Sequence, residues 1–480
     1  MRVLPLFGGS TKSKSAVVSS QRRLNVYYEN RPDGDKTKVA VFGTPGLVSA
    51  FAVPSIFNNP ARAIVGTETA LYVAAYNQFF SLSATGATLA TGALTTMSGL
   101  VSIANSPTQV VVVDGTGAYL FKPSTGAFTP ITPWQATGAR TVTFCSGFFV
   151  AEQPGTQNFW VSNSYDGSTW SALAFAAGAS SPDNILAVDQ LNGILILFMQ
   201  HGTEFWANAG LAPEPFTPLT SAANEYGLAA LFSRAHLDQS ICFLSMTRTG
   251  AVQAVQIVGY NATVISDADM EAIWNTFSVV SDATGLSYQQ DSHKFYQLNF
   301  PTANRSFLFD CSTRLWSEVQ TGGSLLPTRH YGNLSTYYAG GVLIADFATS
   351  QLYRMSAAAF TDNGQPIIRE MVTRHVLSQF NRVRISLLYL DMQTGVGLES
   401  GQGSAPMLML QSSKDNGRTW SGERWAGLGK VGQYRARVAW RRFGSSRDYV
   451  FRIRMSDPVP FVITDGAVKL SEREPAARMG

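Results

Sequence analysis

The feature that most constrains this chain of 480 residues is a repeated pattern of short apolar runs, each of strand length, between about residues 61 and 365. Each unit of roughly 40 residues holds an apolar strand, a turn, a second strand with aromatic residues and a closing hairpin rich in Thr, Ser and Gly. Residues 71–74 lead in this way to residues 79–82, and residues 110–113 lead to residues 119–121. Six or seven such units, with four strands in each, are typical of the closed ring of a β-propeller.

Helical periodicity is almost absent from the chain. Only residues 267–277 are predicted to form a short helix, with Ser266 as its N-cap and acidic residues in its first turn. The sequence therefore predicts an all-β protein, with the propeller at residues 61–365.

A cluster of turn-forming residues at 361–366 predicts the boundary of the propeller. Beyond it apolar and polar residues alternate, the pattern of strands that bury one face, so we expect residues 366–480 to form a small antiparallel β-sandwich. Residues 1–60 carry a strand at 23–28 that has no blade to join, and we expect this N-terminal arm to belong to the same platform domain as the sandwich.

Positive charge is concentrated in the C-terminal quarter. Residues 366–480 hold 18 Lys and Arg against 10 Asp and Glu, whereas the other 365 residues hold 18 basic and 22 acidic residues. Seven arginines alternate with apolar residues along three predicted strands, and we expect them to form an exposed stripe: Arg382, Arg384, Arg435, Arg437, Arg441, Arg452 and Arg454. The stripe would face an anionic partner, or it would be solvated or paired with local acids such as Glu423 and Asp448.

Two segments match the Asp-box pattern, in which an Asp bonds backbone amides two residues on, a Gly takes positive φ and a Trp packs underneath. Residues 413–420 match it in full, and residues 164–170 match a shorter form. We expect both to be structural turns rather than binding sites, built on Asp166, Gly167, Trp170, Asp415, Gly417 and Trp420.

No catalytic, cofactor-binding or metal-binding residue is predicted. The acids of the first 365 residues are scattered, the five histidines are isolated, and the G-x-G-x-x-G match at 427–432 precedes a strand instead of opening a helix. The three cysteines lie far apart without a C-x-x-C pair, so we expect reduced thiols in a chain that assembles in a reducing cytoplasm. The longest apolar run, at 194–199, is too short to span a membrane.

Both ends of the chain resemble the phage packaged-DNA stabilisation family. The opening segment SQRRLNVYYE at 20–29 and the segment VFGTPGL at 41–47 resemble the start of that family. The segments DNGRTW at 415–420, GQY at 432–434 and WRRFG at 440–444 are similar to its C-terminal part.

The resemblance implies a structural tail hub, or nozzle, of a short-tailed bacteriophage, without enzymatic activity. It implies a ring, expected to be a homohexamer, that extends the DNA exit channel below the head–tail adaptor and retains packaged DNA. A tail needle or plug and the tail spikes or fibres would attach to this ring in the virion tail. The seven arginines would then line the lumen, in transient non-specific contact with exiting double-stranded DNA, or would contact an acidic adaptor. The alternative is a propeller-type glycan-binding or glycan-cleaving protein, similar to a sialidase.

Overall fold

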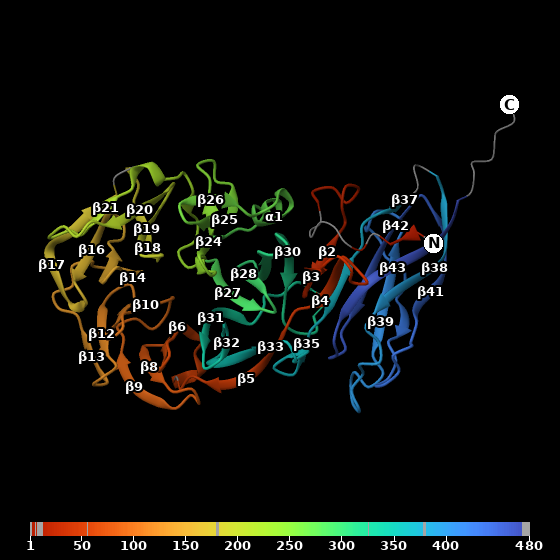
Figure 1. Ribbon diagram of the computed structural model, residues 1–480, viewed down its shortest axis with the longest axis horizontal. Coiled ribbons are helices and arrows are strands. Elements are labelled where there is room, and N and C mark those ends of the chain that lie inside the picture. The colour runs from red at the N-terminus through yellow and green to blue at the C-terminus, as the bar shows by residue number, and fades with distance from the viewer. Residues whose placement is uncertain are drawn as a thin grey trace.

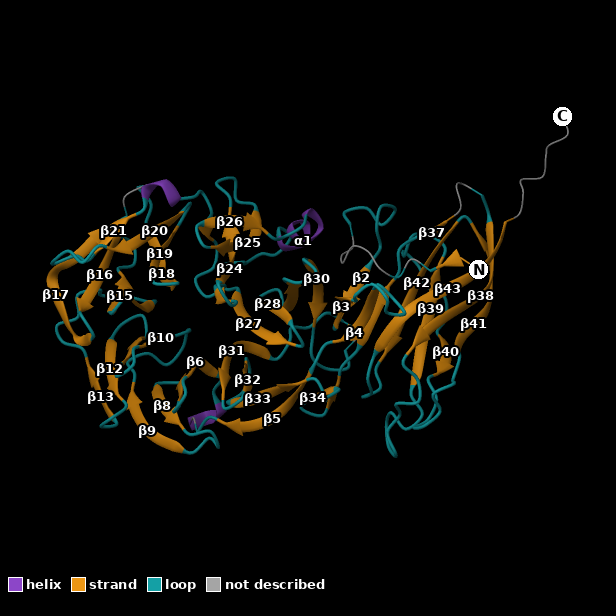
Figure 2. Ribbon diagram, viewed as in Figure 1, coloured by secondary structure: helices purple, strands orange, loops and turns teal. Residues whose placement is uncertain are grey.

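The computed structural model describes residues 2–4, 6, 13–54, 56–178, 182–324, 326–377 and 381–472. Two bodies made of strands lie next to one another, a closed ring of blades and a sandwich of two sheets (Figure 1). In the described part of the chain, helix is limited to α1 (Ala268–Trp274) and the 3-10 turns η1 (Ile56–Asn58) and η2 (Thr220–Ala222) (Figure 2). The predicted fold class, a β-propeller with a β-sandwich, is confirmed.

In the part of the chain that the structure describes, the ring has seven blades. The first four each contain four antiparallel strands in chain order: β6 (Ala61–Gly66), β7 (Leu71–Ala75), β8 (Gln78–Leu82) and β9 (Thr88–Ala93); β10 (Ser102–Asn105), β11 (Val110–Val113), β12 (Ala118–Lys122) and β13 (Ala127–Pro130); β14 (Val142–Cys145), β15 (Phe148–Glu152), β16 (Asn158–Asn163) and β17 (Asp166–Ala177); β18 (Ile185–Leu191), β19 (Ile194–Met199), β20 (Thr203–Asn208) and β21 (Phe216–Pro218). Neighbouring blades pack through their apolar faces, because side chains on both faces of a blade's central strands are buried.

The fifth and sixth blades are also continuous in sequence. The fifth contains β22 (Gly227–Leu228), β23 (Ala235–His236), β24 (Ser240–Met246), β25 (Val252–Val258) and β26 (Asn261–Val264), and the sixth contains β27 (Thr284–Gln290), β28 (His293–Phe300), β29 (Arg305–Asp310) and β30 (Leu315–Val319). The predicted helix between these blades is shorter than expected: it begins after Asp267, whose side chain accepts hydrogen bonds from the amides of Asp269 and Met270, and it ends at Trp274.

The seventh blade closes the ring with a strand from the other end of the domain. Its first three strands are β31 (Gly332–Tyr338), β32 (Gly341–Asp346) and β33 (Gln351–Ser356), and its fourth is β5 (Gly46–Ala52). Leu352 pairs with Phe51, and Ser356 pairs with Gly46. The expectation that all of residues 1–60 belong to the platform domain is therefore corrected at β5, which pairs with β33 as the fourth strand of the seventh blade. The short hairpin of β34 (Thr361–Asp362) and β35 (Gln365–Pro366) follows beside β5.

The sandwich has one sheet of its own and a second sheet that it shares with the propeller. The first sheet contains β1 (Arg2–Val3), β3 (Val26–Asn30), β4 (Val39–Gly43), β43 (Val462–Glu472), β38 (Val383–Met392) and β41 (Val438–Ser446). The second contains β2 (Arg22–Leu24), β36 (Arg369–Val372), β37 (Val376–Leu377), β42 (Asp448–Met455), β39 (Met407–Ser413) and β40 (Arg424–Gly427). Apolar side chains of both sheets, including Trp440, Phe443, Tyr449 and Phe451, form the core between them.

The second sheet is continuous with the sixth blade. Leu24 of β2 pairs in parallel with Glu318 of β30 and antiparallel with Glu370 of β36. One backbone ladder therefore runs from the propeller into the sandwich, so the two domains are joined by paired strands as well as by chain connections.

Asn25, directly after β2, holds this junction together. It is buried and has φ 53°, in the left-handed region that Asn tolerates better than most residues. Its side-chain amide donates to the carbonyl oxygens of Gln320 at 3.0 Å and Ile368 at 2.9 Å, and its side-chain oxygen accepts from the backbone amide of Gln320 at 2.9 Å. Its own carbonyl accepts from the backbone amide of Thr44. Asn25 thus ties the end of the sixth blade to the beginning of the sandwich and to the residues that lead into β5.

We predict that Asn25→Ala lowers the free energy of unfolding by about 3–4 kcal/mol, because it leaves buried backbone groups of Gln320 and Ile368 without partners. Asn192→Ala is the matched control, since Asn192 also has positive φ (52°) but is exposed in a hairpin turn. This control should lower the free energy of unfolding by only about 1 kcal/mol, because Ala tolerates the left-handed backbone less well than Asn does. Urea denaturation of both variants measures the difference, and equal losses would contradict the role given to the Asn25 side chain.

We also predict that a fragment of residues 61–365 melts at a lower temperature than a fragment of residues 44–365. Both lack β2, but only the shorter one lacks β5 and leaves the edge of β33 unpaired. Circular dichroism and light scattering during heating compare the two. If they melt and aggregate alike, β5 is not required to close the ring.

Candidate functional site

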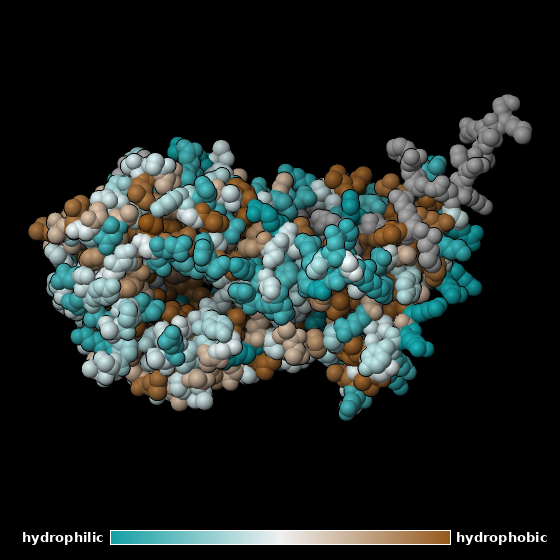
Figure 3. Space-filling model, in the orientation of Figure 1, coloured by the Kyte–Doolittle hydropathy of each residue, from teal (hydrophilic) through white to brown (hydrophobic). Residues whose placement is uncertain are grey.

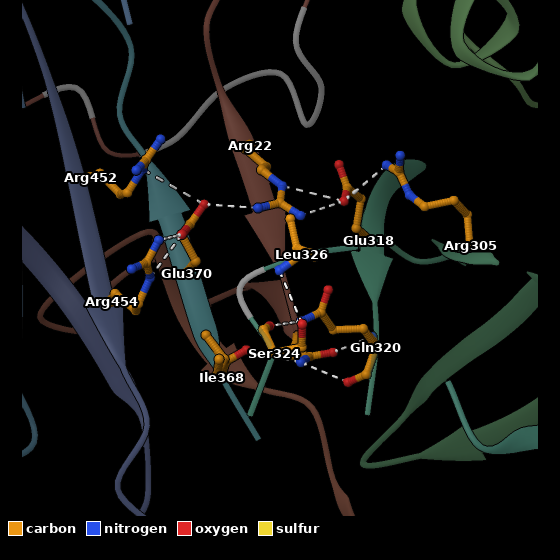
Figure 4. Close-up of polar contacts among 11 residues, drawn as sticks. Arg22, Arg305, Glu318, Gln320, Ser324, Leu326, Ile368, Glu370, Arg452 and Arg454 are labelled. Atoms are coloured by element: carbon orange, nitrogen blue, oxygen red, sulfur yellow. Dashed lines mark hydrogen bonds and ion pairs between the residues drawn. The ribbon is translucent and has the colours of Figure 1, made fainter. Parts of the chain in front are cut away.

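The junction of the two domains carries the densest group of paired charges in the described residues. We define the junction cluster as Arg22, Arg305, Glu318, Glu370, Arg452 and Arg454 (Figure 4). Its members lie on neighbouring strands: β2 and β36 stand between β42 of the sandwich and the strands β30 and β29 of the propeller. Residues paired across adjacent strands share a face, and the ladder therefore places these side chains together on the outer face of the shared sheet.

Arg22 connects the two carboxylates of the cluster. Its guanidinium lies 2.8 Å from the carboxylate of Glu318 and 3.1 Å from that of Glu370. Arg454 approaches Glu370 from the sandwich at 2.5 Å, and Arg305 approaches Glu318 from the propeller at 3.1 Å. These ion pairs therefore join both domains to β2 and β36 across the junction.

The charges of the cluster are not balanced, because four guanidinium groups surround two carboxylates. Burial would raise the pKa of Glu318, but the charges and hydrogen bonds of Arg22 and Arg305 outweigh it and hold that pKa below its ordinary value. Burial lowers the pKa of Arg452, whose nearest carboxylate oxygen in the cluster is 3.9 Å away on Glu370. The six residues of the cluster therefore carry a net positive charge, next to a hollow of about 650 Å³ whose walls include Ile273, Phe277 and Asp269.

Only two of the seven arginines predicted to form one stripe belong to this cluster. Arg452 and Arg454 lie on β42, in the sheet shared with the propeller. Arg384 of β38 and Arg441 of β41 lie exposed on the other sheet, and Arg382 is exposed just before β38. The list of seven is therefore divided between opposite outer faces of the sandwich, and the single stripe is wrong.

The physical reason is that β41 and β42 are consecutive in sequence but belong to opposing sheets. Each strand turns its apolar side chains, such as Trp440 and Ile453, into the shared core, so their polar side chains point in opposite directions. Arg435 and Arg437 differ again, because the predicted strand around them begins only at Val438. They lie exposed in the loop before β41.

Of the two local acids expected as alternative partners of the arginines, Glu423 contacts one of them and Asp448 contacts a histidine instead. Arg454 forms an ion pair with Glu423 at 3.4 Å as well as with Glu370. Asp448 is instead 2.6 Å from the imidazole of His375.

We define the outer basic face as Arg384, Arg441 and Lys469, which lie exposed on adjacent strands β38, β41 and β43. Leu387 of β38 pairs with both Arg441 and Lys469, which places the two cations on either side of it. Within the described ranges none of the three forms an ion pair, and hydrophilic residues gather along this edge of the sandwich (Figure 3). Like charges on neighbouring strands repel, so this face is suited to an anionic partner.

The first Asp-box turn uses its carboxylate internally. Asp166 accepts hydrogen bonds from the backbone amide and the hydroxyl of Ser168, at 3.0 and 2.6 Å. The indole of the buried Trp170 donates to the carbonyl oxygen of Gly167 at 2.9 Å. The positive φ expected at Gly167 occurs instead at Tyr165, at 53°.

The second Asp-box turn has the expected glycine, because Gly417 has φ 80°. Asp415 accepts from the backbone amide of Thr419 at 2.9 Å. Trp420 packs under the guanidinium of Arg452, whose carbon is 3.9 Å from the centre of the indole ring. This turn therefore supports the junction cluster from the sandwich side.

Arg22, Arg305, Glu318 and Glu370 were not among the predicted site residues. One signal was present in the sequence: Glu370 lies in a short run that is otherwise apolar except for Arg369, and a carboxylate buried in such a run requires a cationic partner. The partners themselves could not be named, because Arg22 lies 348 residues away along the chain.

A seven-bladed propeller that shares a sheet with a β-sandwich defines a two-domain β-protein, and comparisons with known proteins assign its family. A family model described as "Bacteriophage P22 Gp10, beta-propeller" matches residues 3–359, and one described as "Bacteriophage P22 Gp10, beta-sandwich" matches residues 368–471. The chain belongs to the family of bacteriophage P22 Gp10, which confirms the resemblance of its two ends to a phage family.

A curated relative is the tail hub protein gp10 of Salmonella phage P22. It is 21% identical over 355 residues, which cover 71% of this chain and 72% of the relative. The family is thus one of structural tail hub proteins.

Two solved structures show a limited similarity to this chain. The WD40 domain of Neurospora crassa Pan2 has a TM-score of 0.42 and 10% identity, covering 65% of this chain and 94% of that domain. The N-terminal domain of Nup159 has a TM-score of 0.41 and 9% identity, covering 70% of this chain and 99% of that domain. The helix of the described region is too short to cross a membrane.

We predict that Glu370→Gln lowers the free energy of unfolding by about 3–5 kcal/mol, because it leaves the cations of the cluster without their shared buried carboxylate. Glu423→Gln is the matched control, since Glu423 contacts the same Arg454 from a more exposed position. It should cost less than about 1 kcal/mol. Thermal and urea unfolding of both variants decide the matter, and similar effects would show that Glu370 has no special role.

Proposed function

We propose that this chain is the structural tail hub subunit of a short-tailed phage virion. Copies form a ring, with six subunits as the expected number, that extends the DNA exit channel below the head–tail adaptor. The ring retains packaged DNA and carries a tail needle or plug and the tail spikes or fibres. Assembly takes place in the host cytoplasm.

One observation supports the proposal: the matches to the P22 Gp10 family cover both domains of the chain, at residues 3–359 and 368–471. The relative named as a tail hub protein matches 71% of the chain.

The architecture also suits a rigid subunit. The ladder through β30, β2, β36 and β42, reinforced by the ion pairs of Arg22, resists movement of one domain against the other. Such a unit keeps its contact surfaces at fixed relative positions, which a closed ring of identical subunits requires.

The exposed arginines remain candidates for two roles. A lumen for moving DNA needs diffuse attraction to phosphates, which weakens steeply with salt. An acidic adaptor would instead be held by fixed charge-assisted hydrogen bonds. We propose that Arg435, Arg437 and the outer basic face serve one of these roles. Arg452 and Arg454 are left out of this proposal, because Glu370 forms an ion pair with Arg454 and lies close to Arg452 at the junction.

The glycan-binding or glycan-cleaving alternative gains no support from the Asp-box turns. Asp166 and Asp415 both direct their oxygens to hydrogen-bond donors of their own turns.

We predict that the double variant Arg435→Glu and Arg437→Glu folds normally, because both side chains are exposed, but fails in one step of particle function. Lost binding to adaptor rings by electron microscopy would support the adaptor role. Particles that assemble but leak or abnormally eject DNA would support the lumen role. Arg248→Glu, at an exposed site in the fifth blade, is the control for a change in charge alone. Normal assembly, DNA retention and ejection in the double variant would rule out both roles for these two arginines.

A further inference from the structure

The boundary between the fifth and sixth blades brings two cysteines together. Along β24, Ile241 and Phe243 face the fourth blade, and Cys242 and Leu244 face the apolar cluster shared with the sixth blade. Cys242 is therefore directed at the sixth blade by the alternation of the strand.

Cys311 approaches the same place from the opposite side. Phe307 and Phe309 of β29 point into the shared cluster, and Cys311, two residues beyond Phe309, continues on that face and packs against the cluster. The two cysteines thus face one another across the blade boundary, although they are 69 positions apart in sequence.

Gln256 lies next to both cysteines. It pairs with Cys242 across β24 and β25, and its side-chain amide donates to the sulfur of Cys311 at 3.9 Å. Cys242 is part of the apolar cluster between the two blades, and Cys311 packs against the same cluster. The neighbouring Cys242 thiol lowers the pKa of Cys311, whereas proximity to Cys311 and burial raise the pKa of Cys242.

The two thiols differ in access to solvent. Cys242 is fully buried, but Cys311 is partly exposed and lines a surface hollow of about 520 Å³ together with Lys294. Reactive cysteines are accessible, have cationic neighbours and lie next to a second thiol that can displace what they bind. Cys311 has all three features.

The third cysteine has none of these features. Cys145 is buried in the third blade and its thiol donates to the carbonyl oxygen of Gly193 at 3.3 Å. Burial raises its pKa to about 11. It therefore serves as an internal control.

We propose that Cys311 and Cys242 form a two-cysteine oxidation site that closes into a disulfide between the fifth and sixth blades. The Cys311 thiolate attacks one sulfur of a low-molecular-weight disulfide such as oxidised glutathione, whose S–S bond breaks and releases one glutathione thiolate. Cys242 then loses its proton and attacks the Cys311 sulfur of the mixed disulfide, which releases the second glutathione. Two protein thiols are oxidised by two electrons, glutathione disulfide is reduced to two thiols, and the two protons from the cysteines end on those thiols.

The closed disulfide would constrain the unfolded chain over the segment between the two cysteines, which stabilises the folded ring. In the proposed virion, which leaves a reducing cytoplasm, this bond would form after assembly. The oxidation site itself does not depend on the tail hub proposal.

The test uses the full chain incubated with oxidised glutathione at mildly alkaline pH. Free thiols, counted after denaturation, should fall from three to one, with the intact mass lower by two hydrogen atoms and a cross-linked peptide that contains Cys242 and Cys311. The melting temperature should rise by several degrees and return to its starting value after reduction with dithiothreitol.

Three variants separate this site from other oxidation. Cys145→Ser should form the same disulfide and show the same rise in melting temperature as the parent protein. Cys311→Ser should keep both of its thiols and show no rise in melting temperature. Cys242→Ala, which preserves a small apolar side chain in the core, should retain one glutathione on Cys311. Three free thiols in the treated parent protein, a persistent glutathione adduct on its Cys311, or loss of thiols through Cys145 would each overturn the proposal.

Discussion

The buried side chain of Asn25 makes hydrogen bonds on which the arrangement of both domains depends. It bonds the segment that leaves the sixth blade and the segment that enters the sandwich, while its carbonyl holds the residues before β5. Each of these groups is buried and would be costly to leave unbonded. The side-chain amide offers donors and an acceptor from one short group, and Asn tolerates the left-handed backbone of this position. No apolar residue could satisfy the same partners.

Charge is used in two different ways on the two sides of the sandwich. At the domain junction, carboxylates such as Glu370 are almost inaccessible to solvent and are engaged by arginines from both domains, an arrangement that fixes geometry. On the opposite face, Arg384 and Arg441 project from the sheet into solvent. The basic excess of the C-terminal quarter is therefore only partly internal, and the remaining part is available to other molecules.

Much of the fold follows from local sequence, because the repeat of apolar strands and turns determines the blades. The seventh blade could not be predicted in full, since its outer strand β5 pairs with β33 about 300 residues later and no local pattern encodes that pairing. The arginines illustrate a second limit. Alternation predicts which side chains of one strand share a face, as for Arg452 and Arg454, but it does not say which of two sheets the strand joins. The junction cluster was missed for the same reason, because Arg22 and Glu370 meet only through the tertiary fold.

The position of β5 determines the order in which this protein can fold as it is synthesised. The strand leaves the ribosome early, but β33 follows only after six blades have been made, so the ring cannot close during most of translation. β2 waits longer still for its partner β36, and β4 waits for its second partner β43. The nascent chain therefore exposes unpaired strand edges for a long time, and its folding is expected to be slow and dependent on contacts of high sequence separation.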